Sequence, residues 1–280
     1  MPNPFAYGAR ITDSSRFVGR ANELRRIFAM LDTAHTGQLQ SVSVVGSRRI
    51  GKSSLLYHLT QTYKQKLSQP DRYTFAYIDL QENSATASLP ALNAHIVNTL
   101  RPAQPPIASL SLVEFESALK QFESAKLVPV ICVDEFEKLI ERPEIFPNDL
   151  YDSWRSLMNN SHASFVVASH LPLHEIVKST KLTSSFFNIF SDFITLGELA
   201  DSEARELINW GKTCDKPFTQ SECDWAIHKA VTILTRFNWQ AVSSIMPSQT
   251  WCGAKWKNNL KRRWRECCHT PKDGRRDLKK

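Results

Sequence analysis

Eight residues near the beginning of the chain have the types and the spacing of a phosphate-binding loop. Residues 46–53 read Gly-Ser-Arg-Arg-Ile-Gly-Lys-Ser and match the pattern G-x-x-x-x-G-K-[ST]. The two glycines allow the backbone to wrap closely around an anion, so that its N–H groups point at phosphate oxygens. Lys52 can reach the outer phosphates of a nucleotide, and the Ser53 hydroxyl can bind Mg²⁺. The residues expected to touch the nucleotide here are Gly46, Ser47, Arg48, Arg49, Ile50, Gly51, Lys52, Ser53 and Ser54.

A second group of polar residues follows a run of apolar ones farther along the chain. The β-branched and apolar run 130–133 ends in Asp134 and Glu135. Asp134, at the carboxyl end of a buried strand, would complete the shell of the Mg²⁺ ion. Glu135 would orient and polarise an attacking water. Phosphoryl transfer needs little beyond a metal, positioning and neutralisation of charge, so these few residues predict hydrolysis of a nucleoside triphosphate.

The elements that must position these residues alternate along the chain. Short buried strands are predicted at 42–45, 73–80, 130–133 and 164–168, and helices at 21–34, after the loop at 46–53, at 88–101 and at 111–126. The first helix carries its apolar side chains at helical spacing, as Leu24, Ile27, Phe28 and Leu31. Strands that alternate with helices predict an α/β fold, a parallel sheet covered on both faces with its site at the carboxyl ends of the strands.

These motifs together resemble a known family. The box Phe17-Val18-Gly19-Arg20 with Glu23-Leu24, the loop at 46–53 and Val-Asp-Glu-Phe-Glu at 133–137 are similar to the AAA+-related STAND and archaeal-type ATPases, relatives of the origin-recognition initiators. The resemblance covers roughly residues 3–230. It implies a P-loop NTPase core with three αβα layers, ATP and Mg²⁺ as cofactors, and slow ATP hydrolysis that drives a conformational switch.

The resemblance also implies roles for residues outside the two motifs. Phe17 and Val18 would contact the adenine base; alternatively they form a hydrophobic staple before the helix at 21–34. Ser169 stands where these ATPases carry a polar sensor of the γ-phosphate, and is therefore a candidate catalytic residue with Glu135 and Lys52; alternatively it caps the next turn. STAND relatives often have an arginine near this point, where this chain has His170. Arg142 and Arg155 are available as arginine fingers, although charged residues on helices are usually solvated.

The same comparison suggests domain boundaries. Residues 1–14 form an N-terminal extension, 15–196 the ATPase core, 197–230 the start of a short, incomplete helical lid, and 231–280 a basic tail. The lid would begin with a helix near 201–211, and Thr219 with Glu222 would form a capping box for a second one. The aromatic stretch that leads into the lid is expected to pack in the core, through Phe186, Phe187, Ile189 and Phe190.

The composition of the tail differs from that of the rest of the chain. Residues 1–230 carry 23 Lys and Arg against 25 Asp and Glu, whereas residues 231–280 carry 12 against 3. The tail also holds four of the seven tryptophans and three of the six cysteines. The near-neutral body lacks the basic surface that nucleic acid requires, so nucleic acid would bind only through the tail.

Two hypotheses account for the tail. In the first, it is read out of frame: starting at the last base of the Ala230 codon, permitted codons for residues 231–239 give Gly-Asn-His-Pro-Tyr-Pro-Phe-Gln-Leu, which restores a helix-ending glycine and the lid motif of the family. In the second, a genuine basic tail binds nucleic acid or an acidic partner. Its residues would be Trp256, Lys257, Lys261, Arg262, Arg263, Trp264 and Arg265. An early stop codon in the shifted frame of the gene would exclude the first hypothesis.

The remaining features narrow the setting and the function. The sequence has no run of 18 apolar residues and no secretory signal pattern, so no membrane partner is expected. Its cysteines form no C-x-x-C pair. Together these features are typical of a cytoplasmic protein. ATP is the expected ligand, and a protein partner or self-association would fit a switch. Two alternatives stay open: a nucleotide-binding module with little hydrolysis, and an origin-type DNA-binding ATPase that uses the tail. Turnover of Glu135→Gln tests the first, and salt-dependent DNA binding tests the second.

Overall fold

Five parallel strands form one sheet at the centre of the protein. The computed structural model describes residues 10–37, 39–82, 86–190, 193–209, 219–221 and 223–224. Its strands are β1 (Val42–Val45), β2 (Tyr73–Asp79), β3 (Val128–Asp134), β4 (Ser164–Ser169) and β5 (Phe193–Thr195). They lie in the order β2-β3-β4-β1-β5, and every neighbouring pair is parallel. The predicted α/β fold with a parallel sheet is confirmed.

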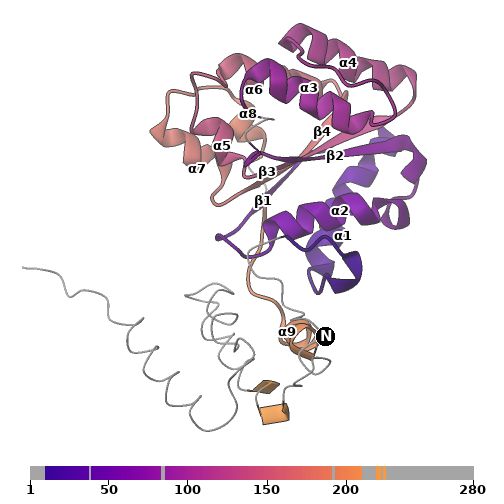
Figure 1. Ribbon diagram of the computed structural model, residues 1–280, viewed down its shortest axis with the longest axis vertical. Coiled ribbons are helices and arrows are strands. Elements are labelled where there is room, and N and C mark those ends of the chain that lie inside the picture. The colour runs from indigo at the N-terminus through magenta and orange to yellow at the C-terminus, as the bar shows by residue number, and fades with distance from the viewer. Residues whose placement is uncertain are drawn as a thin grey trace, which may run out of the picture.

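Helices cover both faces of this sheet and make three layers (Figure 1). One face carries α1 (Ala21–Asp32) and α2 (Lys52–Lys66). The other carries α3 (Leu89–Leu100), α4 (Leu112–Ser124) and α6 (Asn148–Asn159), with the short helices α5 (Glu137–Ile140), α7 (Leu173–Ile176) and α8 (Phe186–Ile189). Single 3₁₀ turns lie at Ser14–Arg16, Thr33–Thr36, Pro70–Arg72 and Val177–Ser179. The last helix described in full, α9 (Asp201–Asn209), follows β5 on the outside of the sheet.

The alternation of side chains along the central strands explains why a core forms on each face of the sheet. Since successive side chains of a strand point to opposite faces, each buried strand supplies two separate cores. The face under α1 and α2 receives Val130, Cys132, Val166 and Ala168. The face under α3, α4 and α6 receives Ile131, Val133, Phe165 and Val167. All eight are fully buried, which is why these strands read as continuous apolar runs rather than alternating ones.

The register of the sheet brings the two sequence motifs to the same edge. Val45, the last residue of β1, lies opposite Ser169 at the end of β4. On the other side of β4, Val133 lies opposite Val167, so Asp134 ends β3 at the same level. The loop that follows β1 and the acids that follow β3 therefore meet at the carboxyl edge, as parallel strands require.

Several predicted elements have slightly different ends in the structure. The helix predicted at 21–34 stops at Asp32 and continues as a 3₁₀ turn, and the helix predicted near 201–211 is described to Asn209. Helix α4 begins with a full capping box between Ser111 and Glu114. Glu222 of the predicted lid cap and the tail at 231–280 lie outside the described residues. Within the described ranges no helix has the length and apolar content needed to cross a membrane.

An aromatic cluster fills the core on the α6 side. Phe186 stacks on Phe136 with ring centroids 5.9 Å apart and meets Phe187 and Phe190 edge to face at 5.6 and 5.2 Å. Trp154 stacks on Phe165 at 4.8 Å in the same cluster. The prediction that the stretch 186–190 packs in the core therefore holds for its three phenylalanines. It is wrong for Ile189, which is 39% exposed, because a single helical turn buries only one side.

Phe186→Ala should destabilise the protein strongly, since it removes a fully buried ring from the centre of this cluster. We expect a loss of about 3–5 kcal/mol in the free energy of unfolding, measured by chemical denaturation. Ile189→Ala, on the exposed side of the same short helix, is the matched control and should change the value by less than about 1 kcal/mol. Equal losses for the two variants would contradict the assigned packing.

Candidate nucleotide-binding site

The loop between β1 and α2 has the form of an anion cradle. A Cβ atom at Gly46 would lie 2.8 Å from Ile50 Cγ2 and 3.1 Å from the carbonyl oxygen of Leu196, so only glycine fits there. Gly51 precedes α2 with φ of 105°, a left-handed conformation that glycine adopts without strain. The Gly46 N–H donates to the Ser169 carbonyl at 3.2 Å, which fixes the start of the loop to the end of β4. The cradle thus opens on the amino end of a fifteen-residue helix, where an anion is stabilised.

Lys52 is buried at the base of this cradle. The residue is only 6% exposed. Its Nζ donates hydrogen bonds to the carbonyl oxygens of Gly46 at 2.8 Å and Ser47 at 3.2 Å. Burial lowers the pKa of the ammonium, and the negative charges of Glu137, Glu135 and Asp134 oppose that shift. An ammonium has three protons, and two of them are engaged with the loop. The third remains for an acceptor such as a phosphate oxygen.

Asp134 ends β3 beside Ser53. The residue is 1% exposed, and its carboxylate accepts hydrogen bonds from the Tyr77 hydroxyl at 2.8 Å, from the Glu135 N–H at 3.0 Å and from the Ser53 hydroxyl. Burial raises the pKa of Asp134, and the bonds from Ser53 and Tyr77 partly offset the rise. A carboxylate and a hydroxyl side by side are the protein ligands that Mg²⁺ uses when phosphates and waters supply the others. The donor set therefore fits this ion.

Glu135 leaves the strand through a strained turn. Its φ is 55°, a left-handed value that is uncommon outside glycine, while the next residue is anchored because the Phe136 N–H donates to the Ala168 carbonyl at 2.9 Å. Burial, followed by the charges of Glu137 and Asp134, raises the pKa of Glu135, and Lys52 and Arg48 counteract this. A carboxylate with a raised pKa is better suited to accept a proton near neutral pH.

Ser169 lies beside the loop, but its hydroxyl is engaged. The residue is fully buried, and Oγ donates to the carbonyl oxygen of Leu171 at 2.6 Å. A capping serine accepts a backbone N–H, whereas this hydroxyl donates to a carbonyl, so the bond matches neither of the two interpretations of this position. The carbonyl of Ser169 holds Gly46, so the residue supports the loop through its backbone.

A small apolar cavity of about 90 Å³ adjoins the loop on the side of the N-terminal segment. Phe17 and Val18 line it, as the resemblance implies for the adenine pocket. The other residues that line it are Ile11, Arg20, Ile50, Gly51, Ser54, Leu199 and Leu207. The Phe17 ring also stacks on the His58 ring at 4.1 Å, and Ser54 Oγ accepts the N–H of Ile11 at 3.0 Å. Residues from the N-terminal segment, from the loop and from the chain after β5 thus enclose one pocket.

Arg20 connects this pocket to α9. Its guanidinium donates to the carbonyl oxygens of Ile50 at 3.2 Å and Gly197 at 2.7 Å. Its own N–H donates to Glu203 Oε1 at 3.0 Å, and the other oxygen of Glu203 accepts the Ala200 N–H at 2.9 Å. Glu203 therefore caps its own helix and binds the N-terminal box with the same carboxylate. The loop at 46–53, the segment after β5 and α9 share these contacts.

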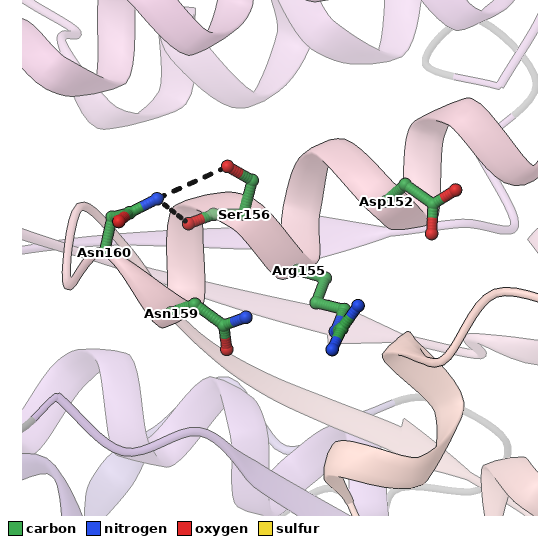
Figure 2. Close-up of a pocket in the computed structure, with 5 residues that line it drawn as sticks. All are labelled: Asp152, Arg155, Ser156, Asn159 and Asn160. Atoms are coloured by element: carbon green, nitrogen blue, oxygen red, sulfur yellow. Dashed lines mark hydrogen bonds between the residues drawn. The ribbon is translucent and has the colours of Figure 1, made fainter.

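The arginines considered as fingers have other environments. The Arg142 guanidinium donates to the carbonyls of Lys138 and Thr86 and lies over the Phe146 ring, which is a structural role. Arg155 is exposed on the outer side of α6, where Figure 2 shows it beside Asp152 and Asn159 at a shallow hollow of about 490 Å³. The residues that line this hollow all come from α6 and its carboxyl end. It lies on a helix surface away from the loop, and we assign no chemistry to it.

The structure brings together most of the predicted residues and adds some that the sequence did not indicate. The loop at 46–53, Asp134, Glu135 and Ser169 meet at one edge of the sheet, and Phe17 and Val18 lie on the adjoining pocket. Tyr77 and Glu203 were missed, because each contacts a residue far away in the chain and no local pattern marks it. Glu137 ends the motif at 133–137, but the sequence analysis gave it no role.

Asp134→Asn should stabilise the protein at neutral pH in the presence of a chelator, because it removes a buried negative charge. Since folding raises the pKa of this carboxyl, the charged form destabilises the fold above that pKa, and the penalty disappears as falling pH protonates it. We expect the melting temperature to rise by about 2–4 °C at pH 7.5 and the gain to fade at acidic pH, as measured by calorimetry. A melting temperature that falls at pH 7.5 would contradict the assigned cost of this charge.

Comparison with solved structures shows the same fold. The Walker-type ATPase of Pyrococcus abyssi aligns with a TM-score of 0.58 at 17% identity, over 81% of this chain and 66% of that one. The Aeropyrum pernix ORC1 protein, solved in complex with DNA, gives 0.54 at 15% identity over 89% and 66%. AMPPCP-bound DnaA from Aquifex aeolicus gives 0.56 at 14% identity over 93% and 72%. This chain thus spans slightly less than two thirds of the first two structures.

A comparison with curated proteins found no match. The family described as AAA ATPase domain, by contrast, matches residues 16–197. That stretch contains the loop at 46–53, the acids after β3 and the whole sheet. With this match over more than half of its length, and with the P-loop fold and cradle described above, the chain belongs to the AAA ATPase domain family.

Proposed function

We propose that this protein binds ATP with Mg²⁺ and hydrolyses it slowly, as a conformational switch of the STAND type. One observation carries the proposal: a buried lysine and three carboxylates converge where an anion cradle opens. Lys52 lies in the field of Asp134, Glu135 and Glu137, and the cradle has space for backbone only at Gly46. Such a concentration of opposite charges suits a highly charged ligand with its metal ion, since the lysine attracts the phosphates and the acids attract the metal.

Each residue has a role in this proposal. The backbone of the loop and Lys52 hold the phosphate chain, and Arg48, whose charge is felt at both Lys52 and Glu135, helps neutralise it. Ser53 and Asp134 hold Mg²⁺, which supplies charge neutralisation when bound. Glu135 orients a water whose oxygen bonds to the γ-phosphorus. The bond from that phosphorus to the bridging oxygen breaks, ADP leaves with the bridging oxygen, and the proton of the water passes to Glu135 or to a phosphate oxygen.

The adenine base would occupy the apolar pocket beside Phe17 and Val18. Two leucines of this pocket, Leu199 and Leu207, come from the segment after β5 and from α9. A ligand there touches the core and α9 at once, and Arg20 and Glu203 join the same parts. Binding energy can therefore change the position of α9, which is what a switch requires.

The alternative is a module that binds ATP and hydrolyses little of it. The hydroxyl of Ser169, the expected sensor, donates to the Leu171 carbonyl, and the Arg142 guanidinium donates to the Thr86 carbonyl. The position of Glu135 next to Asp134 at the end of β3, and the rise of its pKa on burial, support a role as the base. We therefore favour slow hydrolysis, in a reducing compartment such as the cytoplasm, where the fully buried Cys132 thiol stays reduced.

Lys52→Ala should abolish binding and Glu135→Gln should abolish only turnover. We expect Lys52→Ala to weaken ATP·Mg²⁺ binding by about 100-fold or more in calorimetry, since a buried charge partner of the phosphates is lost. Glu135→Gln should bind ATP within a few fold of wild type and hydrolyse it about 100-fold more slowly.

Glu141→Gln, an exposed acid that pairs with Lys138, is the control for these variants and should match wild type in both assays. Equal turnover by wild type and Glu135→Gln would favour the module without hydrolysis. If Lys52→Ala binds ATP as tightly as wild type, the loop at 46–53 is not the nucleotide-binding site.

Glu203→Gln should weaken the coupling between the pocket and α9. The amide can accept only one of the two N–H groups that the carboxylate now accepts, so we expect the dissociation constant for ATP to rise about fivefold, the equivalent of about 1 kcal/mol. Nucleotide-induced protection of α9 in hydrogen exchange should fall with it. Glu206→Gln, an exposed change on the same helix, is the control. Unchanged affinity and protection in Glu203→Gln would contradict the assigned link.

A further inference from the structure

A cluster of one arginine and two tyrosines lies next to Asp134, and the account above gives it no role. The Arg10 guanidinium carbon lies over the Tyr77 ring, 4.8 Å from its centroid, and over the Tyr57 ring, 5.2 Å from its centroid. The two rings meet edge to face with their centroids 5.7 Å apart. Arg10 Nη1 also donates to Asp79 Oδ2 at 3.2 Å. The segment before α1 thus contacts α2 and β2 through one cation.

Tyr77 connects this cluster to the acid that ends β3. Its hydroxyl donates to Asp134 Oδ2 at 2.8 Å, while the Glu135 N–H donates to Asp134 Oδ1 at 3.0 Å. The Ser53 hydroxyl donates to the same carboxylate. Because each oxygen has a donor from a different strand or turn, the plane of the carboxylate is fixed. A carboxylate has about four acceptor positions, so room for a metal ion remains.

The two rings, more than the ion pair, hold the Arg10 guanidinium in place. Its Nε is buried and makes no hydrogen bond within the described part of the chain, although arginine normally uses this donor. The side chain as a whole is 31% exposed, and an ion pair at such a position contributes little by itself. A cation over two aromatic rings is attracted to both of them. The loss of one hydrogen bond is therefore offset by contact with the rings.

Arg10 acts on the Tyr77 hydroxyl in two ways. It fixes the ring between the N-terminal segment and the sheet, so that the hydroxyl is directed at Asp134. Its positive charge over the ring also draws electrons away from the hydroxyl group, which strengthens the hydrogen bond that this group donates. Arg10 thus contributes to the orientation of Asp134 without touching it.

The next residue fastens the same segment to the first turn of α2. The Ile11 N–H donates to Ser54 Oγ at 3.0 Å, and Ile11 lines the apolar pocket beside Phe17. Ser54 directly follows Ser53, which binds Asp134. Two consecutive residues of the N-terminal segment therefore reach both parts of the proposed nucleotide site, one the pocket for the base and the other the acid for the metal.

We propose that Arg10 and Tyr77 are positioning residues for Mg²⁺: Arg10 holds the Tyr77 ring, and the Tyr77 hydroxyl holds the Asp134 carboxylate in the orientation that the ion requires. Mg²⁺ demands near-ideal octahedral geometry, and the partners that orient a metal ligand change metal affinity about 10–100-fold when they are removed. The effect passes through Asp134, so it appears only when Mg²⁺ is present. The inference rests on the proposed Mg²⁺ site, and it does not require hydrolysis.

Single substitutions separate the two residues and have matched controls. Tyr77→Phe removes only the hydroxyl. Tyr73→Phe is its control, because Tyr73 lies at the amino end of the same strand and its hydroxyl donates to the Leu31 carbonyl at 3.0 Å. Arg10→Gln removes the cation, and Arg10→Lys keeps the charge without the flat guanidinium. Arg25→Gln, on the exposed side of α1, is the control for these two.

The measurement is the dissociation constant of AMPPNP in EDTA and in excess Mg²⁺, and the ratio of the two constants reports the contribution of the ion. We expect Tyr77→Phe to reduce this ratio about tenfold and to leave the affinity in EDTA within about twofold of wild type. Arg10→Gln should reduce the ratio about threefold, and Arg10→Lys should reduce it less. Tyr73→Phe and Arg25→Gln should leave it unchanged.

The double variant tests whether Arg10 acts through Tyr77. Arg10→Gln combined with Tyr77→Phe should lower the ratio no further than Tyr77→Phe alone, since the hydroxyl that Arg10 positions is already absent. Additive losses would overturn this role of Arg10. An unchanged ratio in Tyr77→Phe, an equal loss of affinity in EDTA, or an equal loss in Tyr73→Phe would overturn the whole proposal.

The carbon resonance of Tyr77 Cζ in the wild type gives a test that does not depend on any variant being folded. Its chemical shift reports the hydrogen bond of the hydroxyl, so it should move when Mg²⁺ is added to the AMPPNP complex, while that of Tyr73 stays. A Tyr77 signal that does not move overturns the proposal.

The wild type separates this inference from the proposed function. Binding of AMPPNP with no dependence on Mg²⁺, or no binding at all, would refute the proposed metal site and this inference together. A wild type that binds with Mg²⁺ but hydrolyses no ATP would refute the proposed hydrolysis alone, and the ratio in Tyr77→Phe would still decide the role of Tyr77. A Mg²⁺-dependent wild type with an unchanged ratio in Tyr77→Phe would overturn this inference alone.

Discussion

The positive charge of Lys52, buried at the base of the loop, determines how the rest of the site must be built. An ammonium removed from water is costly unless acceptors and opposite charges surround it. Two loop carbonyls supply the acceptors, and Asp134, Glu135 and Glu137 supply the charge. These acids lie at the end of β3, in the turn after it and at the start of α5, and β4 lies between β3 and β1. The loop is therefore stable in this form only when three neighbouring strands end at the same level.

Three carboxylates so close together would repel one another without donors of their own. Asp134 receives hydroxyl groups from α2 and from β2, through Ser53 and Tyr77. Glu137 receives a ring nitrogen from the end of β4, through His170. Glu135 has the strained backbone, and burial together with the charges of Glu137 and Asp134 raises its pKa. The residue with this strain and this raised pKa is the one proposed to meet a water, a common arrangement at active sites.

The parts of this site that could be predicted are those encoded by neighbouring residues. The loop at 46–53 and the acids at the end of β3 are each recognisable from a few consecutive residues. Hydrophobic periodicity predicted the strands and helices that flank them. Contacts such as Tyr77 with Asp134, 57 residues apart, or Arg20 with Glu203, 183 apart, follow from sheet order and from the path of the chain after β5. For Ser169 the position was predictable but not the direction of the hydroxyl, because a backbone acceptor two residues on competes for it.

The central place of β1 in the sheet has a consequence for the synthesis of this chain. Val45 pairs with Ser169 on one side and with Thr195 on the other, so both neighbours of β1 are made long after it. On the ribosome, the segment Val42–Val45 leaves early as an apolar strand without partners, and the loop beside it gains a fixed shape only when β4 and β5 have emerged. A nascent chain must therefore carry an unpaired, aggregation-prone strand until β4 and β5 have been made, and a translational pause before these strands would prolong that exposure.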